Sequence, residues 1–286
     1  MINRVFSLRF ILLMMLFLGV MLESNAYDFE SGGIYYNITS TTNMTVAVTY
    51  YSQTNNKYSG MVSIPATVSY NNKTYTVTAI GNYAFVGCTG LSGFSIQSQN
   101  LTSIGSYAFS GCNGMTSVTI PAQVNSVGNY AFSGCFAITQ VTFSEATETL
   151  SLGYGNSKGS SYGLFEDCPL KKVIINRPLS YNTSSSYGYS PFARQSALTS
   201  ITFGANVTSI PGNVFYGNTS ITTFTVPSHI TNLSDYAFNG FTGAKTITLA
   251  EGTKTISNYA FSGCTSLTKV NILGGEEAWE GVRFVD

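Results

Sequence analysis

One phenylalanine position recurs along this chain and constrains its fold more than any other feature. Eight phenylalanines each end one copy of a unit that is 23 residues long wherever nothing is inserted. They are Phe85, Phe109, Phe132, Phe165, Phe192, Phe215, Phe238 and Phe261. Self-similarity at a fixed period of this size predicts a solenoid, because such units bury their apolar faces only by stacking on their neighbours.

The apolar residues within one unit predict a strand followed by a return segment. After the Phe comes a turn rich in Gly, Cys, Asn and Ser, and then three apolar residues such as Met115, Val118 and Ile120. The last two alternate with polar residues, as expected of a half-buried strand. A further aliphatic residue, such as Val127, precedes the next Phe. We expect the Phe rings to stack into a continuous buried spine, each contributing roughly 1.5–3 kcal/mol by burial.

This pattern resembles the leucine-rich repeats of the BspA-like family, the treponemal-type class. It is most complete in residues 104–121, I-G-S-Y-A-F-S-G-C-N-G-M-T-S-V-T-I-P, and it extends over residues 77–273. The resemblance implies a β-rich, right-handed leucine-rich-repeat solenoid, with a parallel sheet on its concave side and short turns or 3-10 segments on its convex side. It also implies a surface protein that adheres to host matrix proteins, host cells or other microbes, and it does not imply an enzyme.

The ends of the chain predict an export signal and an N-terminal cap. Residues 1–26 combine a basic start, an apolar run from Phe10 to Leu22 and a small-residue cleavage site, which is the pattern of a signal peptide. We therefore expect export to the cell surface or the extracellular space, with the periplasm as the alternative, and no membrane span after cleavage. Residues 27–76 predict an all-β cap over the first rung, and residues 274–286 a short C-terminal segment.

The low charge of the chain argues against nucleic-acid binding. Charged residues make up 9% of the chain, and Lys and Arg together are as numerous as Asp and Glu. Nothing in this composition would attract nucleic acid or an anionic membrane. We expect a monomer whose partner is an extracellular protein, in the matrix or on a cell surface, or a glycan.

The five cysteines share one repeat position, three residues after a Phe. A position that accepts Gln, Asn or Phe in other units predicts a packing or turn role, with free buried thiols. Since neighbouring rungs of a parallel sheet lie about 4.8 Å apart, a disulfide between neighbouring cysteines is the alternative. The position holds Cys88, Cys112, Cys135, Cys168, Gln195, Asn218, Phe241 and Cys264.

Two consecutive units are longer than the rest, with insertions at residues 144–163 and 176–190. Ser160 and Tyr187 stand in these units where the return-segment aliphatic is expected, and the added sequence is rich in Tyr, Ser, Gly and Asn. Antibody paratopes use this composition, because tyrosine gives contact area at low entropic cost. The alternative is that both insertions are tolerated surface loops, since such loops cost little closure entropy. The candidate binding residues are Tyr154, Tyr162, Tyr181, Tyr187 and Tyr189.

A column of threonines gives a second candidate binding surface. One outward-facing strand position holds threonine in five of the eight units. On the concave face these residues would form a flat polar strip for a protein or glycan partner. The alternative is that threonine is present for its β propensity alone. The residues are Thr119, Thr142, Thr202, Thr225 and Thr248.

No recognisable catalytic motif is present. The sole histidine, His229, lies in a return segment. The nearest approach to a carboxylate cluster is Glu145, Glu148, Glu166 and Asp167, around the longer insertion. Their spacing matches no catalytic or calcium-binding pattern, and no zinc, phosphate-loop or nucleophile-elbow motif occurs. We predict no enzymatic activity, no metal and no cofactor.

Two functions remain open on these grounds. The first is an exported leucine-rich-repeat protein that binds protein or glycan partners non-covalently, in adhesion to host matrix proteins, host cells or other microbes. The alternative is a structural component of the cell envelope without a dedicated ligand. A third, a carbohydrate-active enzyme, would need a pair of acids that the sequence does not display.

Overall fold

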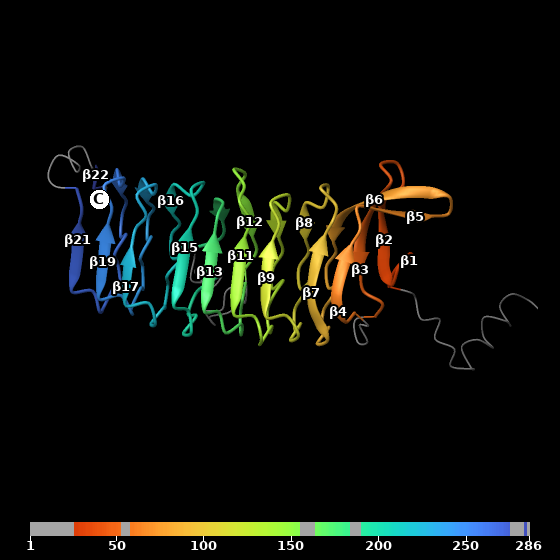
Figure 1. Ribbon diagram of the computed structural model, residues 1–286, viewed down its shortest axis with the longest axis horizontal. Coiled ribbons are helices and arrows are strands. Elements are labelled where there is room, and N and C mark those ends of the chain that lie inside the picture. The colour runs from red at the N-terminus through yellow and green to blue at the C-terminus, as the bar shows by residue number, and fades with distance from the viewer. Residues whose placement is uncertain (1–25, 53–57, 155–163, 184–189, 275–282, 285–286) are drawn as a thin grey trace, which may run out of the picture.

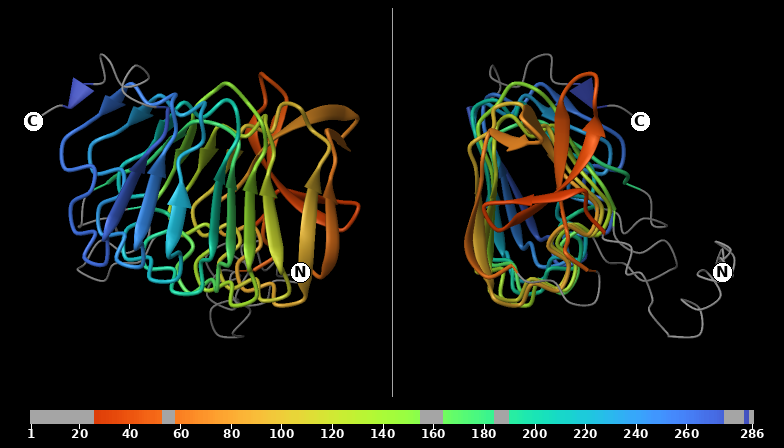
Figure 2. Two further views of the ribbon diagram at one scale, coloured as in Figure 1. Left: turned by 60° about the vertical axis from the view of Figure 1, so that its left-hand side comes forward. Right: turned by 90° about the vertical axis from the view of Figure 1, so that its right-hand side faces the viewer.

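The computed structural model describes residues 26–52, 58–154, 164–183, 190–274 and 283–284. Within these ranges the chain forms 22 strands and no helix. The repeats coil into one elongated stack in which each repeat forms one rung (Figure 1), and seen along the stack the rungs superimpose around a single core (Figure 2). The fold is a leucine-rich-repeat solenoid, as the sequence predicts.

Each rung contributes one longer strand to a surface that we call the long-strand face. Val141 of one strand aligns with Val118 of the strand before it, so equivalent repeat positions lie side by side in parallel strands. Buried Ile120 alternates with exposed Thr119, which is the period of a half-buried strand. The strands form the parallel sheets β4-β7, β9-β11-β13-β15 and β17-β19-β21. Their bounds are β4 (Gly60–Ile64), β7 (Leu91–Ile96), β9 (Ser117–Ile120), β11 (Gln140–Phe143), β13 (Lys172–Ile175), β15 (Ser200–Phe203), β17 (Thr223–Thr225), β19 (Thr246–Leu249) and β21 (Lys269–Ile272).

The return segments form a second ladder of short parallel strands, in addition to the turns that the family resemblance implies. Their backbone groups pair with the same groups of the neighbouring rung, as Ser126 pairs with Ser103 and Ser151. Pairing across rungs satisfies N–H and C=O groups that would otherwise be buried without partners. These strands are β8 (Ser103–Ile104), β10 (Ser126–Val127), β12 (Leu150–Leu152), β14 (Leu179–Ser180), β16 (Ser209–Ile210), β18 (Asn232–Leu233), β20 (Thr255–Ile256) and β22 (Arg283–Phe284).

The N-terminal residues are all β, as predicted, and lie at one end of the stack (Figure 1). Antiparallel pairing links β1 to β2 and β2 to β3, while β5 and β6 form a hairpin. β6 then pairs in parallel with both β3 and β8, so this region continues the short-strand ladder. Its role as a cap stays a prediction. The strands are β1 (Phe29–Ser31), β2 (Ile34–Ser40), β3 (Thr45–Thr49), β5 (Thr67–Tyr70) and β6 (Lys73–Ile80).

The predicted phenylalanine spine forms the centre of the core in two runs rather than one. Neighbouring rings are stacked with centroids 4.9–5.9 Å apart from Phe85 to Phe192. They are 5.3 Å apart from Phe215 to Phe261. No ring stacking joins Phe192 to Phe215 among the described side chains. The expectation of a continuous spine is therefore wrong at this one step.

The short-strand ladder is interrupted at the same rung, next to Pro211. At this repeat position a backbone N–H of other rungs donates to the preceding rung, as Gly128 does to the carbonyl of Ile104 at 2.8 Å and Ser257 does to that of Leu233 at 2.9 Å. Pro211 has no N–H to donate, and β14 and β16 are not paired. A side chain replaces the missing bond, because the hydroxyl of Tyr181 donates to the carbonyl oxygen of Gly212 at 3.1 Å.

The cysteine position supplies a hydrogen-bond donor to the preceding rung. All five cysteines are free, as the packing interpretation predicts. The thiol of Cys112 donates to the carbonyl oxygen of Phe85 at 3.0 Å, and the Gln195 amide donates in the same way to Phe165 at 3.1 Å. Phe241 cannot donate, and its ring instead lies 4.6 Å from that of Phe215. A shared donor explains why both Cys and Gln occur at this position.

A fully buried arginine ties three rungs together, and nothing in the repeat pattern predicts it. Arg177 is 0% exposed. Its guanidinium donates to the carbonyl oxygens of Ala122 and Val124 at 2.8 Å each, and to that of Glu148 at 2.8 and 3.1 Å. Burial lowers the pKa of this group, but a guanidinium remains protonated in proteins. Four carbonyl contacts thus replace the water that the charge has lost.

Candidate functional site

Both insertions enter the fold between a short strand and the following Phe turn. Leu152 pairs with Val127, so it fills the return-segment aliphatic position and is 5% exposed. The register of β12 and β14 places Tyr181 at the same position one rung later. The interpretation that put Ser160 and Tyr187 there is therefore wrong. Ser160 and Tyr187 are found by counting back from each Phe at the regular spacing. That spacing does not apply here, because the added residues lie between the aliphatic position and the Phe.

The bases of the two insertions lie on neighbouring rungs, because β12 and β14 pair in parallel. Tyr154 is half-buried at the base of the first insertion; its N–H donates to the side chain of Asn129 at 3.1 Å, and its ring lies edge-on to Tyr130. Tyr181, below the second insertion, is also half-buried and packs against the core. The other three candidate tyrosines lie outside the described residues: Tyr162, Tyr187 and Tyr189.

The turns after Phe165 and Phe192 differ from all regular turns at one position. Two residues after the Phe, the six other repeats have a glycine with positive φ, such as Gly134 at 70°. Asp167 and Arg194 occupy this position with φ of 61° and 56°. That conformation costs a residue with a side chain roughly 1–2 kcal/mol. The two stretched repeats therefore place opposite charges on neighbouring rungs, at a position that favours glycine.

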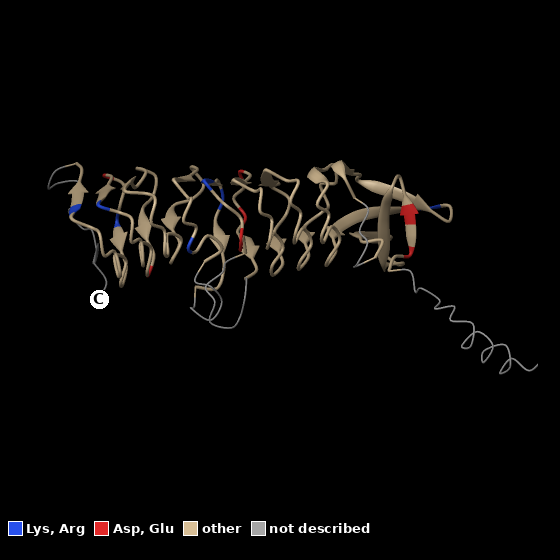
Figure 3. Ribbon diagram, turned by 90° about the horizontal axis from the view of Figure 1, so that it is seen from below, with Lys and Arg blue, Asp and Glu red and all other residues tan. Residues whose placement is uncertain are grey.

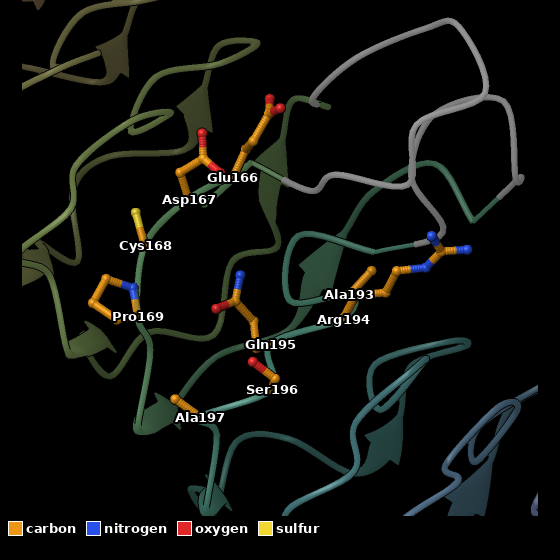
Figure 4. Close-up of a pocket in the computed structure, with 9 residues that line it drawn as sticks. All are labelled: Glu166, Asp167, Cys168, Pro169, Ala193, Arg194, Gln195, Ser196 and Ala197. Carbon is orange, nitrogen blue, oxygen red and sulfur yellow. The ribbon is translucent and has the colours of Figure 1, made fainter.

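A cleft of about 250 Å³ opens between these two turns. In regular turns the glycine N–H donates to the next rung, as Gly111 does to the carbonyl of Ser133 at 2.9 Å. Within the described ranges, the N–H of Asp167 makes no such bond to the turn after Phe192. Figure 4 shows the two segments that form the walls. They are Glu166, Asp167, Cys168 and Pro169 on one side, and Ala193, Arg194, Gln195, Ser196 and Ala197 on the other.

The charged groups of the cleft are placed unequally. Glu166 is half-buried and Asp167 is exposed. Burial, and then the proximity of Asp167, raise the pKa of the Glu166 carboxyl. The guanidinium carbon of Arg194 lies 6.0 Å from the centre of the Tyr216 ring, and its side chain points away from both carboxylates (Figure 4). Both carboxylates thus belong to one wall of the cleft, and the cation belongs to the other.

Charge is absent from the rungs that precede this cleft. Residues 74–144 contain no Asp, Glu, Lys or Arg, and Figure 3 shows the corresponding uncharged stretch of the coil. Charged side chains reappear at Glu145, in the first stretched repeat. Among the repeats, charged side chains therefore occur only in the stretched repeats and in those that follow them.

An exposed aromatic side chain lies beside the cleft. Phe136 is 62% exposed and occupies the same repeat position as Pro169, which lines the cleft one rung later. Single exposed apolar residues are common on protein surfaces, so the exposure alone has little meaning. Its position next to a cleft whose walls combine apolar and charged residues is typical of an interaction surface. Sequence reasoning missed Phe136, although comparison with Asn113 and Ser196 at the same position would have shown it.

The predicted threonine column lies in register on the long-strand face. Thr142 aligns with Thr119, and Thr248 aligns with Thr225. Thr119, Thr202 and Thr225 are exposed, whereas the other two are half-buried. The column forms two stretches, because β15 and β17 are not paired. Its role in binding stays a prediction.

Sequence reasoning also missed a column of stacked tyrosines, two residues before the Phe. Ring centroids of Tyr83 and Tyr107 lie 5.1 Å apart, and those of Tyr107 and Tyr130 lie 4.7 Å apart. Tyr236 and Tyr259 stack in the same way at 5.2 Å. All five have positive φ, and the repeated Tyr-Ala-Phe triplet was the signal for the column. Stacking offsets part of the backbone cost that this conformation imposes.

The carboxylates that the sequence groups around the longer insertion lie at two different bends. Glu145 and Glu148 lie between β11 and β12, whereas Glu166 and Asp167 lie in the turn after Phe165. In the part of the chain that the structure describes, no three His, Cys, Asp or Glu side chains gather as metal ligands would. The predicted absence of enzymatic activity, metal and cofactor stays a prediction.

Stacked rungs, two parallel ladders and a core of repeated apolar positions define a leucine-rich-repeat protein, a class that typically serves in binding or structure. Within that class, the sequence pattern of the BspA-type leucine-rich repeat region matches residues 66–181 and 158–278, in six copies. The chain belongs to the BspA-type leucine-rich-repeat family. The resemblance proposed from the repeat pattern is thereby confirmed.

Solved structures of bacterial leucine-rich-repeat proteins are similar to this chain. One from Bacteroides ovatus is 20% identical with a TM-score of 0.52, over 91% of this chain and 78% of its own. A leucine-rich cell surface protein from Faecalibacterium prausnitzii is 18% identical with a TM-score of 0.30, over 89% and 97%. One from Eubacterium ventriosum is 17% identical with a TM-score of 0.39, over 86% and 71%. The first of these similarities supports the fold.

No curated protein matches the chain. Within the described ranges, the structure contains no helix of the length and apolar character that a membrane span requires.

Proposed function

We propose that this chain is an exported, surface-displayed protein that binds extracellular proteins or glycans non-covalently. Its main contact is the stretched-repeat edge, which we define as Phe136, the cleft between the turns after Phe165 and Phe192, and the two insertions. The observation that carries the proposal is the cleft itself. It departs from the repeat at the one place where the chain also departs in length.

The regular rungs are less suited than this edge to the recognition of a specific ligand. Regular rungs present nearly the same side chains at every step, so they can stabilise the fold but offer little to distinguish one ligand from another. A specific ligand needs a concave site with a few polar groups and an apolar anchor. Asp167, Arg194 and Phe136 provide such groups where the regular turns have glycine or a small polar residue.

The insertions and the threonine column contribute further contacts in this proposal. In the two insertions, Tyr162, Tyr187 and Tyr189 would supply the aromatic side chains that paratopes use for contact area. Thr119, Thr142, Thr202, Thr225 and Thr248 form a second, flatter contact on the long-strand face. Export rests on the predicted signal peptide at residues 1–26, and surface display on the family resemblance.

The test is a binding panel with variants that separate the two surfaces. Residues 27–286 are assayed against purified matrix proteins and a glycan array. Phe136→Ala should weaken binding of a true ligand by about tenfold or more, as expected for an aromatic anchor. The double variant Thr119→Glu, Thr142→Glu reports separately on the long-strand face. Thermal unfolding of each variant excludes a loss of fold as the cause.

A further variant tests the insertions without disturbing the rungs. Deleting residues 155–162 and 184–189 restores the regular spacing between the short strand and the Phe, while keeping Tyr154 and Thr183 at the bases. Stability should change by less than about 0.5 kcal/mol, and ligand binding should fall. If the panel yields no ligand, or if every variant binds as the parent does, the chain is better described as a structural surface component.

A further inference from the structure

One step of the coil lacks three of the contacts that join neighbouring rungs elsewhere. On the long-strand face β15 and β17 do not pair, and in the short-strand ladder β14 and β16 do not pair. Among the described side chains, the stacked phenylalanine rings stop at Phe192 and resume at Phe215. All three gaps fall on one boundary, which separates the chain up to β15 from the chain that begins at β16 (Figure 1).

No other step within the described ranges loses more than one of these contacts. At the step from β7 to β9 the long strands are also unpaired, but β8 pairs with β10 and the rings of Phe85 and Phe109 stack at 4.9 Å. In repeat proteins each unit contacts only its neighbours, so the stiffness of the stack at a given step depends on the contacts of that step. The boundary after β15 is therefore the step at which the stack bends most easily.

The short-strand side of this boundary contains open space where other rungs have a backbone ladder. A cleft of about 150 Å³ lies there, with Pro178 and Leu179 on one rung and Thr208 and Ser209 on the next among its lining residues. Neither paired backbone nor packed side chains fill this space. The two rungs consequently have room to approach each other or to separate.

Two side-chain hydrogen bonds cross the short-strand gap in place of the missing ladder. The hydroxyl of Tyr181 donates to the carbonyl oxygen of Gly212 at 3.1 Å, and the amide of Asn213 donates to that of Thr183 at 2.9 Å. Side chains change rotamer far more readily than a paired backbone changes its register. These two bonds therefore restrain the relative movement of the rungs less than a ladder does.

The turn side of the same boundary is joined as it is elsewhere in the coil. The N–H of Arg194 donates to the carbonyl oxygen of Tyr216 at 2.8 Å, and the amide of Asn218 donates to that of Leu198 at 3.0 Å. The backbone connection is residues 204–208, between β15 and β16. Firm contacts on one side of the coil and gaps on the others are the arrangement of a hinge.

We propose that the solenoid is hinged at this boundary, with β1 to β15 and β16 to β21 as two stacks that each move as one body. The hinge side is formed by the turns after Phe192 and Phe215. Bending changes the separation of β15 and β17, and with it the separation of Thr202 and Thr225. The two stretches of the threonine column thus change their relative orientation, whether or not a ligand is bound.

The test compares two pairs of spin labels on residues 27–286 by double electron–electron resonance. Thr119→Cys with Thr225→Cys spans the boundary, and Ser95→Cys with Thr202→Cys lies before it. Each pair is four repeats apart at exposed positions, which is about 19 Å at the usual strand spacing of about 4.8 Å. The boundary pair should give the broader distance distribution. Pro211→Ser, which restores a backbone donor, should narrow it.

The labels are introduced in a Cys264→Ser chain, because Cys264 is half-buried whereas the other four cysteines are buried. Thermal unfolding of each labelled chain excludes a loss of fold. Equal widths for the two pairs would overturn the hinge. A broader distribution for the boundary pair that Pro211→Ser leaves unchanged would support the hinge and show that the missing donor of Pro211 is not what loosens it.

Discussion

The thiol of Cys112 donates a hydrogen bond to the carbonyl oxygen of Phe85, one repeat earlier, at 3.0 Å. The same contact recurs from Cys135 to Phe109 at 3.1 Å. It links the turn of one rung to the turn of the next, beside the phenylalanine spine. Because the thiol proton is used in this bond, the contact favours a reduced, protonated cysteine at this position.

Free, buried thiols predict a defined alkylation pattern. Four of the five cysteines are buried and Cys264 is half-buried, so iodoacetamide at pH 8 should modify the folded protein slowly, and Cys264 first. After denaturation without reductant, mass spectrometry should show modification at all five positions. Fewer than five modified cysteines that rise to five on reduction would instead reveal a disulfide.

The buried thiol of Cys88 predicts that stability is lost at alkaline pH. Burial raises the pKa of Cys88 from 9.0 to about 11, and burial also raises the pKa of Tyr58. A raised folded-state pKa means that the folded chain holds its proton more tightly, so stability is full below about pH 9 and falls as the pH rises through 11. Urea unfolding at pH 8, 10 and 11 measures this. A Cys88→Ala chain should lose less stability over the interval, and a flat profile for the parent would contradict the expectation.

The phenylalanine spine predicts that replacing a spine residue costs far more unfolding free energy than replacing an exposed phenylalanine of the same turn. Phe132 is fully buried and Phe136 is 62% exposed. Phe132→Ala should cost about 3–5 kcal/mol of unfolding free energy, whereas Phe136→Ala should change it by no more than about 0.5 kcal/mol. Chemical denaturation of both variants gives the comparison. Equal losses would mean that Phe132 is not a core residue of the kind described.

The hydrogen bonds of the buried Arg177 predict that replacing this residue destabilises the fold, because the carbonyl groups that it contacts would lose their donors. Arg177→Met keeps much of the side-chain volume but removes four hydrogen bonds to Ala122, Val124 and Glu148, and should cost about 3 kcal/mol or more. Lys254→Met, at an exposed position, should have almost no effect. An Arg177→Met protein as stable as the parent would show that those carbonyls find other partners.

The close approach of two rungs at Gly128 predicts that no side chain fits at this position. A Cβ at Gly128 would lie 2.4 Å from the backbone nitrogen of Ser106, so Gly128→Ala must push two rungs apart and lower the melting temperature. At Gly93 the nearest atom, at 3.0 Å, is the end of the Met61 side chain, which is 67% exposed and can move. Gly93→Ala should therefore be tolerated, and thermal melts of the pair test this.

Repeated apolar positions made the fold predictable. Most long strands show an alternation of apolar and polar residues and follow a repeat Phe at nearly the same separation in sequence. Residues such as Val118 and Ile120 are buried where the alternation places them. The short strands were not predictable in the same way. Two residues, as in Ser126–Val127, are too few to show a period, and their pairing depends on stacked neighbours.

The details of the stretched repeats were only partly predictable. Counting back from Phe165 could not show that Leu152 fills the aliphatic position, because the added residues follow it. Arg177 escaped notice because charged residues are expected at the surface. The substitution of Asp167 and Arg194 for glycine was visible in the sequence, but its meaning depends on the cleft, which forms only where the two turns fail to pair.

Photocrosslinking tests whether the stretched-repeat edge contacts the partner. A photoreactive phenylalanine analogue is placed at position 136 and, in a separate chain, at position 61, where Met61 is similarly exposed at 67% but lies in the strand β4, far along the stack. With a ligand identified from the panel, irradiation should give a crosslinked product from position 136 and none from position 61. Crosslinking from position 61 alone would show that the partner binds elsewhere on the solenoid and not at the stretched-repeat edge.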